Sequence, residues 1–229
     1  MILEVENLRA RYESVEVLKG ITVKLKAAEI VALIGPNGSG KSTLFKAVCG
    51  LLRPVTGSIR FLKRGIEMAD AETVLRLGLG YVPQGRRVFP SLTVDENLDL
   101  GGYLLRSGTA LAKRKREIYT RFPVLESKAH QLAAALSGGQ QQILGVARAL
   151  MLSPRLMLLD EPSLGVDPRT LEAVFEIVQQ LKTDGVAVFV IEQNVRAALA
   201  VADRVYVLKT GDIVDEGSPS EIERRLNSL

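Results

Sequence analysis

The fold of this chain is decided by IVALI (Ile30–Ile34), followed directly by GPNGSGKST (Gly35–Thr43). A short, continuous apolar run is typical of a strand that is buried on both faces of a sheet. The glycine-rich stretch matches the phosphate-binding loop consensus, in which backbone N–H groups wrap the phosphates of a nucleotide. Lys41 would reach the β- and γ-phosphates, and the Ser42 hydroxyl would bind Mg²⁺. A helical pattern over 42–52 follows, so we predict a nucleotide site rather than a simple glycine turn. The predicted nucleotide-binding residues are the whole loop: Gly35, Pro36, Asn37, Gly38, Ser39, Gly40, Lys41, Ser42 and Thr43.

Length and composition indicate one sizeable domain over residues 1–229, because 47% hydrophobic and 24% charged residues are ordinary proportions for a globular protein. No apolar run approaches the roughly 18 residues of a membrane-spanning helix. The start, MILEVENLRA, lacks the basic and apolar regions of a signal peptide. We therefore expect a cytosolic chain whose membrane role comes through partners. The lone Cys49 lies in an apolar helical pattern, which favours a buried, inert thiol.

The net charge of +4 is mild, and basic residues concentrate in the run KRKR at positions 113–116. Such a run could bind nucleic acid or anionic lipid. Few aromatic residues accompany it and Glu117 interrupts it. A solvated helix face is therefore the favoured interpretation, and we expect no nucleic-acid partner.

Hydrophobic patterning predicts an α/β fold. Alternating segments at 3–6 and 15–23 predict an antiparallel β subdomain at the N-terminus. The remaining predicted strands are short and lie at 79–82, 156–159, 186–191, 204–208 and 212–216. Predicted helices alternate with them at 168–182, 195–202 and the C-terminus, which favours a parallel core sheet. The stretch 89–151 carries helix-like segments and no convincing strand, so we interpret it as a helical subdomain within the domain.

Polar residues follow several of the predicted buried strands. Gln84, the pair Asp160-Glu161 and the pair Glu192-Gln193 each stand at or just beyond such a strand. In open α/β sheets, ligands bind beyond the carboxyl ends of the strands, so these residues are expected to share one active site. Asp160 would hold the metal, while Glu161 would polarise the attacking water as general base. The two acids could instead cap the next helix, but beside a phosphate loop the catalytic role is favoured.

LSGGQQQ (Leu136–Gln142) has the composition of a second phosphate cradle. It contains no lysine and no carboxylate, so it could hold a phosphate but could not catalyse alone. One alternative is a capping box, since Ser137 is followed three residues later by Gln140. Two glycines in the first turn count against a plain cap, because each costs a helix roughly 1 kcal/mol relative to Ala. Glycine permits close approach of a ligand, and a helix N-terminus favours anions. The segment is therefore predicted to meet a nucleotide bound by another subunit.

These motifs together resemble an ABC-type ATPase. The phosphate loop, Gln84, LSGGQ, LMLLDEP (Leu156–Pro162) and SLGVD (Ser163–Asp167) occur in the order and approximate spacing of that family, and the resemblance covers essentially the whole chain. It implies a P-loop NTPase core that binds ATP and Mg²⁺. It also implies a head-to-tail dimer, in which the signature residues Ser137, Gly138, Gly139 and Gln140 of one subunit close over ATP held by the other.

The same resemblance assigns three further residues. Tyr12 occupies the aromatic position that stacks on adenine, although packing within its strand would explain Tyr12 almost as well. Gln84 belongs to the Q-loop, where it would serve the metal and the catalytic step. Asp167 belongs to the D-loop, beside the nucleotide.

A narrower resemblance concerns VPQGRRVFP (Val82–Pro90) and VIEQN (Val190–Asn194). Both look like the ATPase subunits of branched-chain amino acid importers and of their urea or amide relatives. Most ABC ATPases carry a switch histidine where this chain has Gln193. The single histidine, His130, lies far upstream and is expected to be structural. Gln193 can donate a neutral hydrogen bond to a γ-phosphate oxygen, but it carries neither charge nor proton.

The resemblance implies the ATP-hydrolysing subunit of an importer for branched-chain amino acids or related small polar solutes. Its expected partners are integral membrane permease subunits, a second ATPase subunit and, indirectly, a substrate-binding protein, with the chain peripheral on the cytoplasmic side of the cell membrane. A soluble ABC ATPase of DNA repair or translation is the alternative. The first usually has a long coiled-coil insertion and the second two cassettes, and 229 residues accommodate neither. A P-loop kinase or GTPase would leave LSGGQ without a role.

Overall fold

The computed structural model describes residues 1–85, 88–165 and 167–228. Arg86, Arg87 and Val166, which belong to the motifs above, and the terminal Leu229 lie outside the described residues. The strands are β1 (Leu3–Tyr12), β2 (Val15–Leu25), β3 (Ile30–Ile34), β4 (Thr56–Phe61), β5 (Arg64–Gly65), β6 (Leu79–Val82), β7 (Leu156–Asp160), β8 (Ala187–Glu192), β9 (Arg204–Lys209) and β10 (Asp212–Gly217). The helices are α1 (Lys41–Val48), α2 (Ala71–Arg76), α3 (Val94–Gly101), α4 (Gly108–Arg121), α5 (Pro123–Glu126), the 3₁₀ turn η1 (Ala133–Ala135), α6 (Gly138–Leu150), α7 (Pro168–Thr183), α8 (Val195–Val201) and α9 (Pro219–Leu226).

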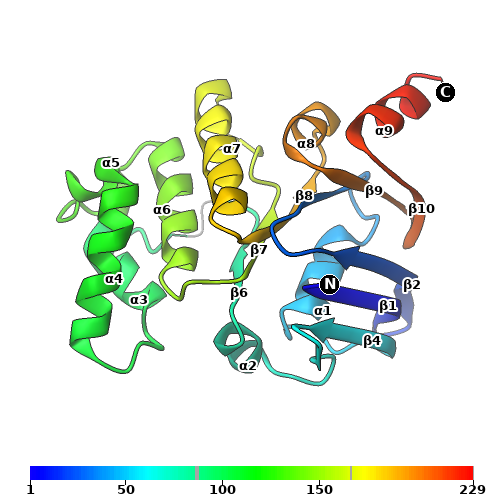
Figure 1. Ribbon diagram of the computed structural model, residues 1–229, viewed down its shortest axis with the longest axis horizontal. Helices are drawn as coiled ribbons and strands as arrows, with labels where there is room; N and C mark the ends of the chain where they lie inside the picture. The colour runs from blue at the N-terminus through cyan, green and yellow to red at the C-terminus, as the bar shows by residue number, and fades with distance from the viewer. Residues whose placement is uncertain (86–87, 166, 229) are drawn as a thin grey trace.

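The strands form two sheets, as the α/β interpretation predicts (Figure 1). The N-terminal sheet has the order β2-β1-β4-β5 and is antiparallel. The core sheet has the order β10-β9-β3-β8-β7-β6; it is parallel from β9 to β6, and β10 pairs antiparallel with β9. The parallel order brings the carboxyl ends of β3, β6, β7 and β8 to the same edge. This edge is where the sequence places its polar motifs.

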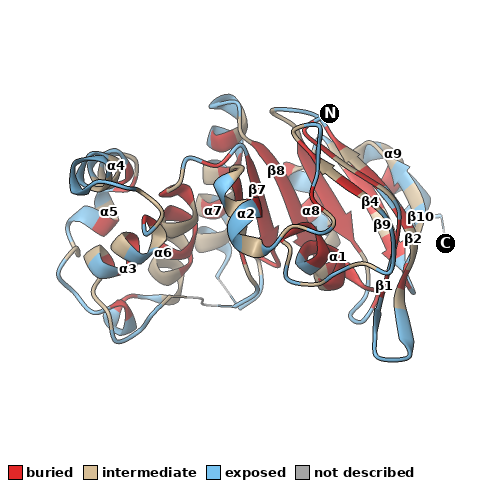
Figure 2. Ribbon diagram, turned by 90° about the horizontal axis from the view of Figure 1, so that it is seen from below, coloured by how far each residue is buried: buried red, intermediate tan, exposed pale blue. Residues whose placement is uncertain are grey.

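The central strands β3, β7 and β8 are apolar up to their carboxyl ends because they are covered on both faces. Strands β7 and β8 are buried along their whole length (Figure 2). Their successive side chains enter different clusters: Leu156 and Leu158 pack with α1 and the N-terminal sheet, whereas Met157 and Leu159 pack with helices α6 and α7. This is the expected result of a period of two residues in a strand that is buried on both sides.

Residues 89–151 form α3, α4, α5, η1 and α6, together with one isolated bridge between Thr93 and Leu132. These helices lie side by side at one end of the molecule, away from the N-terminal sheet (Figure 1). Helix α6 packs against both α3 and β6, and so joins this region to the core sheet. The assignment of 89–151 as a separate subdomain stays a prediction.

The basic run at 113–116 lies on α4 and is only partly a solvated face. Lys113 and Arg116 are exposed. Arg114 instead donates to the Leu150 carbonyl and pairs with Glu117. Lys115 pairs with two carboxylates, Asp95 and Asp99. Half of the run therefore stabilises contacts within the protein.

Helix α1 is shorter than the predicted 42–52, because it ends at Val48 and is followed by Gly50 with a φ of 70°. The left-handed conformation at Gly50 stops the helix before Pro54. Cys49 caps this end and is buried, and burial raises the pKa of its thiol. The sequence interpretation did not include β4 or α2. The alternation in TGSIRF (Thr56–Phe61) was the signal available for β4.

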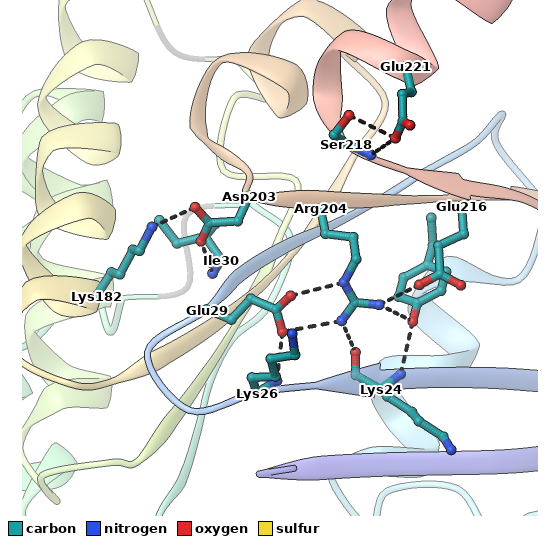
Figure 3. A network of polar contacts seen from close by, with 11 residues as sticks. Lys24, Lys26, Glu29, Ile30, Lys182, Asp203, Arg204, Glu216, Ser218 and Glu221 are labelled. Atoms are coloured by element: carbon teal, nitrogen blue, oxygen red, sulfur yellow. Dashed lines mark hydrogen bonds and ion pairs between the residues drawn. The ribbon is translucent and has the colours of Figure 1, made fainter.

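A polar network around Arg204 joins the N-terminal sheet to the core sheet (Figure 3). Arg204 Nε donates to Glu29 Oε1 at 2.9 Å, and its Nη2 donates to the Lys24 carbonyl. Its Nη1 pairs with Glu216 of β10. The network therefore fixes the turn before β3, and with it the start of the strand that leads into the phosphate loop. Among the described residues, no helix is long and apolar enough to cross a bilayer.

Candidate active site

The phosphate loop connects β3 to α1 in a conformation that its glycines permit. Gly38 and Gly40 have φ values of 76° and 111°, a region that L-residues with side chains rarely adopt. At Gly35 an added Cβ would collide with the carbonyl oxygen of Leu208 in β9. The loop is thus packed tightly against the neighbouring strand.

Lys41, the first residue of α1, is 5% exposed and bonded within the loop. Its Nζ donates to the carbonyls of Gly35 at 2.8 Å and Pro36 at 3.0 Å, and lies 3.9 Å from Glu161 Oε1. Burial lowers the pKa of Lys41, while the charges of Glu161 and Asp160 oppose that shift. Ser39 is 3% exposed, and its hydroxyl has no hydrogen-bond partner in the part of the chain that is described. A buried amine and an unpaired buried hydroxyl suit an anionic ligand such as a phosphate.

Asp160, the last residue of β7, accepts from two hydroxyls. Ser42 Oγ lies 3.4 Å from its Oδ1, and Tyr81 OH lies 3.2 Å from its Oδ2. Burial raises the pKa of Asp160. Within the described ranges, no three His, Cys, Asp or Glu residues group together to hold a metal alone. A hydroxyl beside one carboxylate nevertheless fits Mg²⁺, which usually takes one or two carboxylates and fills its shell with phosphates and water.

Glu161 follows Asp160 and adopts a φ of 51°, which is unusual for a residue with a side chain and frequent at functional sites. Its carboxylate is 7% exposed. Gln84 Nε2 donates to its Oε2 at 2.7 Å, so a residue beyond β6 meets one beyond β7 across 77 positions of sequence. The predicted metal and catalytic residues therefore do come together at this edge of the sheet.

A cavity of about 510 Å³ gathers Tyr12 and most residues of the predicted phosphate loop. It is lined by Tyr12, Val17, Asn37, Gly38, Gly40, Lys41, Ser42, Thr43, Gln84 and Glu161. Tyr12 is 43% exposed, and Lys46 Nζ lies 5.9 Å from its ring centre. An exposed aromatic ring beside the phosphate loop favours the predicted adenine contact over packing within the strand.

Gln193 opens onto a second cavity of about 330 Å³, which Glu161 also lines. Its other walls come from Ser163, Leu164, Gly165, Glu192 and Asn194. Glu161 thus lies between the nucleotide-sized cavity and Gln193. Tyr81 is a contributor that the sequence analysis did not include. Glu192 was expected at this edge because it follows a buried strand, but it was assigned no chemical role of its own.

The signature residues lie apart from this site and are satisfied locally. Ser137 and Gln140 form the capping box at the start of α6, with both reciprocal hydrogen bonds present. At Gly139 an added Cβ would collide with Thr170 of α7. Close packing of α6 on α7 therefore requires Gly139 without any ligand, so this glycine does not count against a plain cap, contrary to the sequence-based expectation. Asp167 caps α7 and accepts from the Thr170 hydroxyl at 2.6 Å.

Comparison with known proteins agrees with this geometry. A family model described as ABC transporter matches residues 18–164. The chain is 42% identical to the high-affinity branched-chain amino acid transport ATP-binding protein BraG of Pseudomonas aeruginosa, covering 93% of this chain and 91% of the relative. It is 35% identical to the lipopolysaccharide export system ATP-binding protein LptB of Haemophilus influenzae, covering 96% and 92%. A dimeric post-hydrolysis structure of the ATP-binding cassette MJ0796, bound to ADP and Pi, matches with a TM-score of 0.84 and 28% identity over 95% of this chain and 98% of that one. The chain therefore belongs to the ABC transporter family and is an ATP-binding, ATP-hydrolysing transporter subunit.

Proposed function

We propose that the chain drives an importer of branched-chain amino acids or related small polar solutes. The observation that carries this proposal is the 42% identity with BraG over nearly the full length of both chains, against 35% with the export protein LptB. In this proposal the chain lies on the cytoplasmic side of the membrane. It works there with integral membrane permease subunits, a second ATPase subunit and, indirectly, a substrate-binding protein.

ATP would occupy the cavity between Tyr12 and the phosphate loop. The adenine would stack on Tyr12, and Lys41 would exchange its loop carbonyls for the β- and γ-phosphates. The Ser39 hydroxyl and the backbone N–H groups of the loop would donate to the remaining oxygens. Ser42, Asp160 and Gln84 would hold Mg²⁺, which supplies charge neutralisation to the phosphates when bound.

Glu161 would act as the general base. A water molecule attacks the γ-phosphorus, its proton passes to Glu161, and the bond to the β-phosphate oxygen breaks to leave ADP and phosphate. Gln193 would donate a hydrogen bond to a γ-phosphate oxygen from the opposite side of Glu161. Both residues line the same 330 Å³ cavity, which supports this pairing.

The signature segment would act on the nucleotide of a second subunit. The N-terminus of α6 carries the positive end of a helix of 13 residues, and Ser137 is exposed there. The signature residues are not among those that line the 510 Å³ cavity of the phosphate loop, so a head-to-tail dimer would give this segment a ligand. Asp167 would lie at the same interface.

Transport by the assembled complex tests the proposed substrate. The chain would be co-purified with candidate permease subunits, reconstituted in proteoliposomes with the matching binding protein, and assayed for ATP-dependent uptake of labelled leucine. The same complex carrying Glu161→Gln is the control, and it should take up little leucine. Extraction of lipopolysaccharide without leucine uptake would overturn the import proposal.

A further inference from the structure

Glu192 is a buried carboxylate to which the mechanism above gives no role. It ends β8 and is 0% exposed. Burial raises the pKa of Glu192, and hydrogen bonds from Ser163 and from the backbone N–H of Asn194 oppose that shift. A carboxyl group without contact to water costs free energy unless hydrogen bonds compensate it, so its partners indicate what it does.

Those partners join the end of β8 to the turn after β7, at the edge of the core sheet. Glu192 Oε1 accepts from the backbone N–H of Ser163 at 2.9 Å, and its Oε2 accepts from the Ser163 hydroxyl at 2.6 Å. A further hydrogen bond lies beside these two: the backbone N–H of Glu161 donates to the Ile191 carbonyl at 2.9 Å. The turn after β7, which carries Glu161, is thereby bonded to the end of β8.

Gln193 lies directly after Glu192, which Ser163 holds, and directly before Asn194. The Asn194 side chain also caps α8 by accepting from the backbone N–H of Ala197 at 3.2 Å. The side chain of Gln193 itself is exposed, and it has no hydrogen-bond partner in the described part of the chain. Its placement therefore depends on the backbone on either side.

We propose that Glu192 is a positioning residue that holds Gln193 toward the cavity it shares with Glu161. The carboxylate does so by bonding the end of β8, directly before Gln193, to Ser163 in the turn after β7. This inference rests on the proposed role of Gln193 at the γ-phosphate. Glu192 contacts no reacting atom, so it acts on turnover through Gln193.

The first test compares Glu192→Ala with Glu192→Gln in steady-state ATPase assays on the transporter complex. Glu192→Ala should lower kcat by about the same factor as Gln193→Ala, roughly two- to tenfold, because the same neutral hydrogen bond is lost. The dissociation constant for Mg-ATP should stay within about twofold in both variants, since neither residue lines the 510 Å³ cavity. Glu192→Gln should keep most of kcat, because its amide oxygen can accept from the Ser163 N–H and its NH₂ can donate to the Ser163 hydroxyl.

The decisive test is a double-mutant cycle on kcat. In the Gln193→Ala background, Glu192→Ala should lower kcat by less than about twofold further, since the residue it positions is already absent. If Glu192→Ala does not fold, Ser163→Ala replaces it in the cycle, with Ser163→Thr as the variant that keeps the hydroxyl. Tyr206→Phe, which removes a buried hydroxyl from the Arg204 network, controls for a general loss of stability. It should lower Tm and leave kcat unchanged.

The outcomes separate this inference from the proposed function. Equal fold-losses from Glu192→Ala in both backgrounds would overturn the positioning role while leaving Gln193 in the mechanism. A normal kcat in Gln193→Ala would remove both the positioning role of Glu192 and the proposed role of Gln193 at the γ-phosphate. A fall in kcat that merely follows Tm across Glu192→Ala and Tyr206→Phe would make Glu192 a stability residue only.

Discussion

The phosphate loop and the signature segment are both glycine-rich turns before a helix, yet they are built differently. In the phosphate loop, Lys41 and Ser39 are buried, and Lys41 lines a cavity that Glu161 also lines. In the signature segment, Ser137 is exposed and its hydroxyl is occupied by the backbone N–H of Gln140. The first turn has a charged lysine and carboxylates around it, whereas the second offers only a helix end and small residues.

This difference assigns nucleotide binding to the phosphate loop and dimer formation to the signature segment. A cavity with its own cation and metal-binding oxygens can hold a nucleotide within one chain. A helix N-terminus without cation or carboxylate contributes at most a few hydrogen bonds and the end of a dipole. The signature segment is therefore expected to matter only once a nucleotide is already bound elsewhere, as the head-to-tail dimer requires.

The largest effect is expected at Lys41. Lys41→Ala should abolish tight Mg-ATP binding in calorimetry, because backbone N–H groups cannot replace the charge on the β- and γ-phosphates. Lys182→Ala, which removes an amine that pairs with Asp203 and does not line the 510 Å³ cavity, is the control and should bind Mg-ATP normally. Undiminished affinity in Lys41→Ala would show that the loop is not the nucleotide site.

Glu161→Gln should separate binding from turnover. The amide keeps an oxygen for Gln84 but cannot accept a proton, so hydrolysis should fall by roughly 10²–10⁴-fold while ATP binding remains. Trapped ATP should also favour a closed dimer, which light scattering measures. Glu176→Gln, an exposed carboxylate on α7, should leave both unchanged. Near-normal turnover in Glu161→Gln would remove Glu161 from the mechanism.

Two substitutions at Ser137 test the signature segment in the Glu161→Gln background. Both Ser137→Arg and Ser137→Ala lose the observed cap, which costs about 1 kcal/mol of stability. Only Ser137→Arg puts a bulky cation where the partner's γ-phosphate should dock, so only Ser137→Arg should block ATP-driven dimerisation while sparing ATP binding to the monomer. Equal dimer formation in the two variants would leave Ser137 with a capping role alone. Melting temperature and light scattering on the same samples give the comparison.

The smallest effect is expected at Gln193. Gln193→Ala removes one neutral hydrogen bond, worth roughly 0.5–1.5 kcal/mol, and should lower turnover only modestly. Gln193→His should be tolerated, and it should add a pH dependence to hydrolysis near the unperturbed histidine pKa of ~6.5. The natural protein should lack any step at this pH that is assignable to position 193. If the pH profiles of Gln193→His and the natural chain coincide, the side chain at 193 does not reach the γ-phosphate.

The local sequence predicted a helix or strand correctly where its hydrophobic pattern fitted only one kind of element. IVALI at Ile30–Ile34 forms β3 with the predicted bounds, because five apolar residues before a glycine loop fit only a strand buried on both sides. The end of α1 was misplaced because the helical pattern continues past Gly50, whose positive φ stops the helix. At Gly139 the sequence suggested a ligand, but the neighbour that requires glycine is Thr170, 31 positions away in the chain.

The sequence by itself determined the fold class, the phosphate loop and the order of the catalytic motifs. Each of these is recognised from residue patterns within single strands, loops or helix starts and from their succession along the chain. Only the tertiary structure decided which side chains meet. It places Gln84 against Glu161, Tyr81 against Asp160, and Ser163 against Glu192. Each of these contacts joins residues at or just beyond the carboxyl ends of different parallel strands, and the pairing follows from the order of strands in the sheet. That order is set by long-range packing of buried faces, which no local pattern encodes.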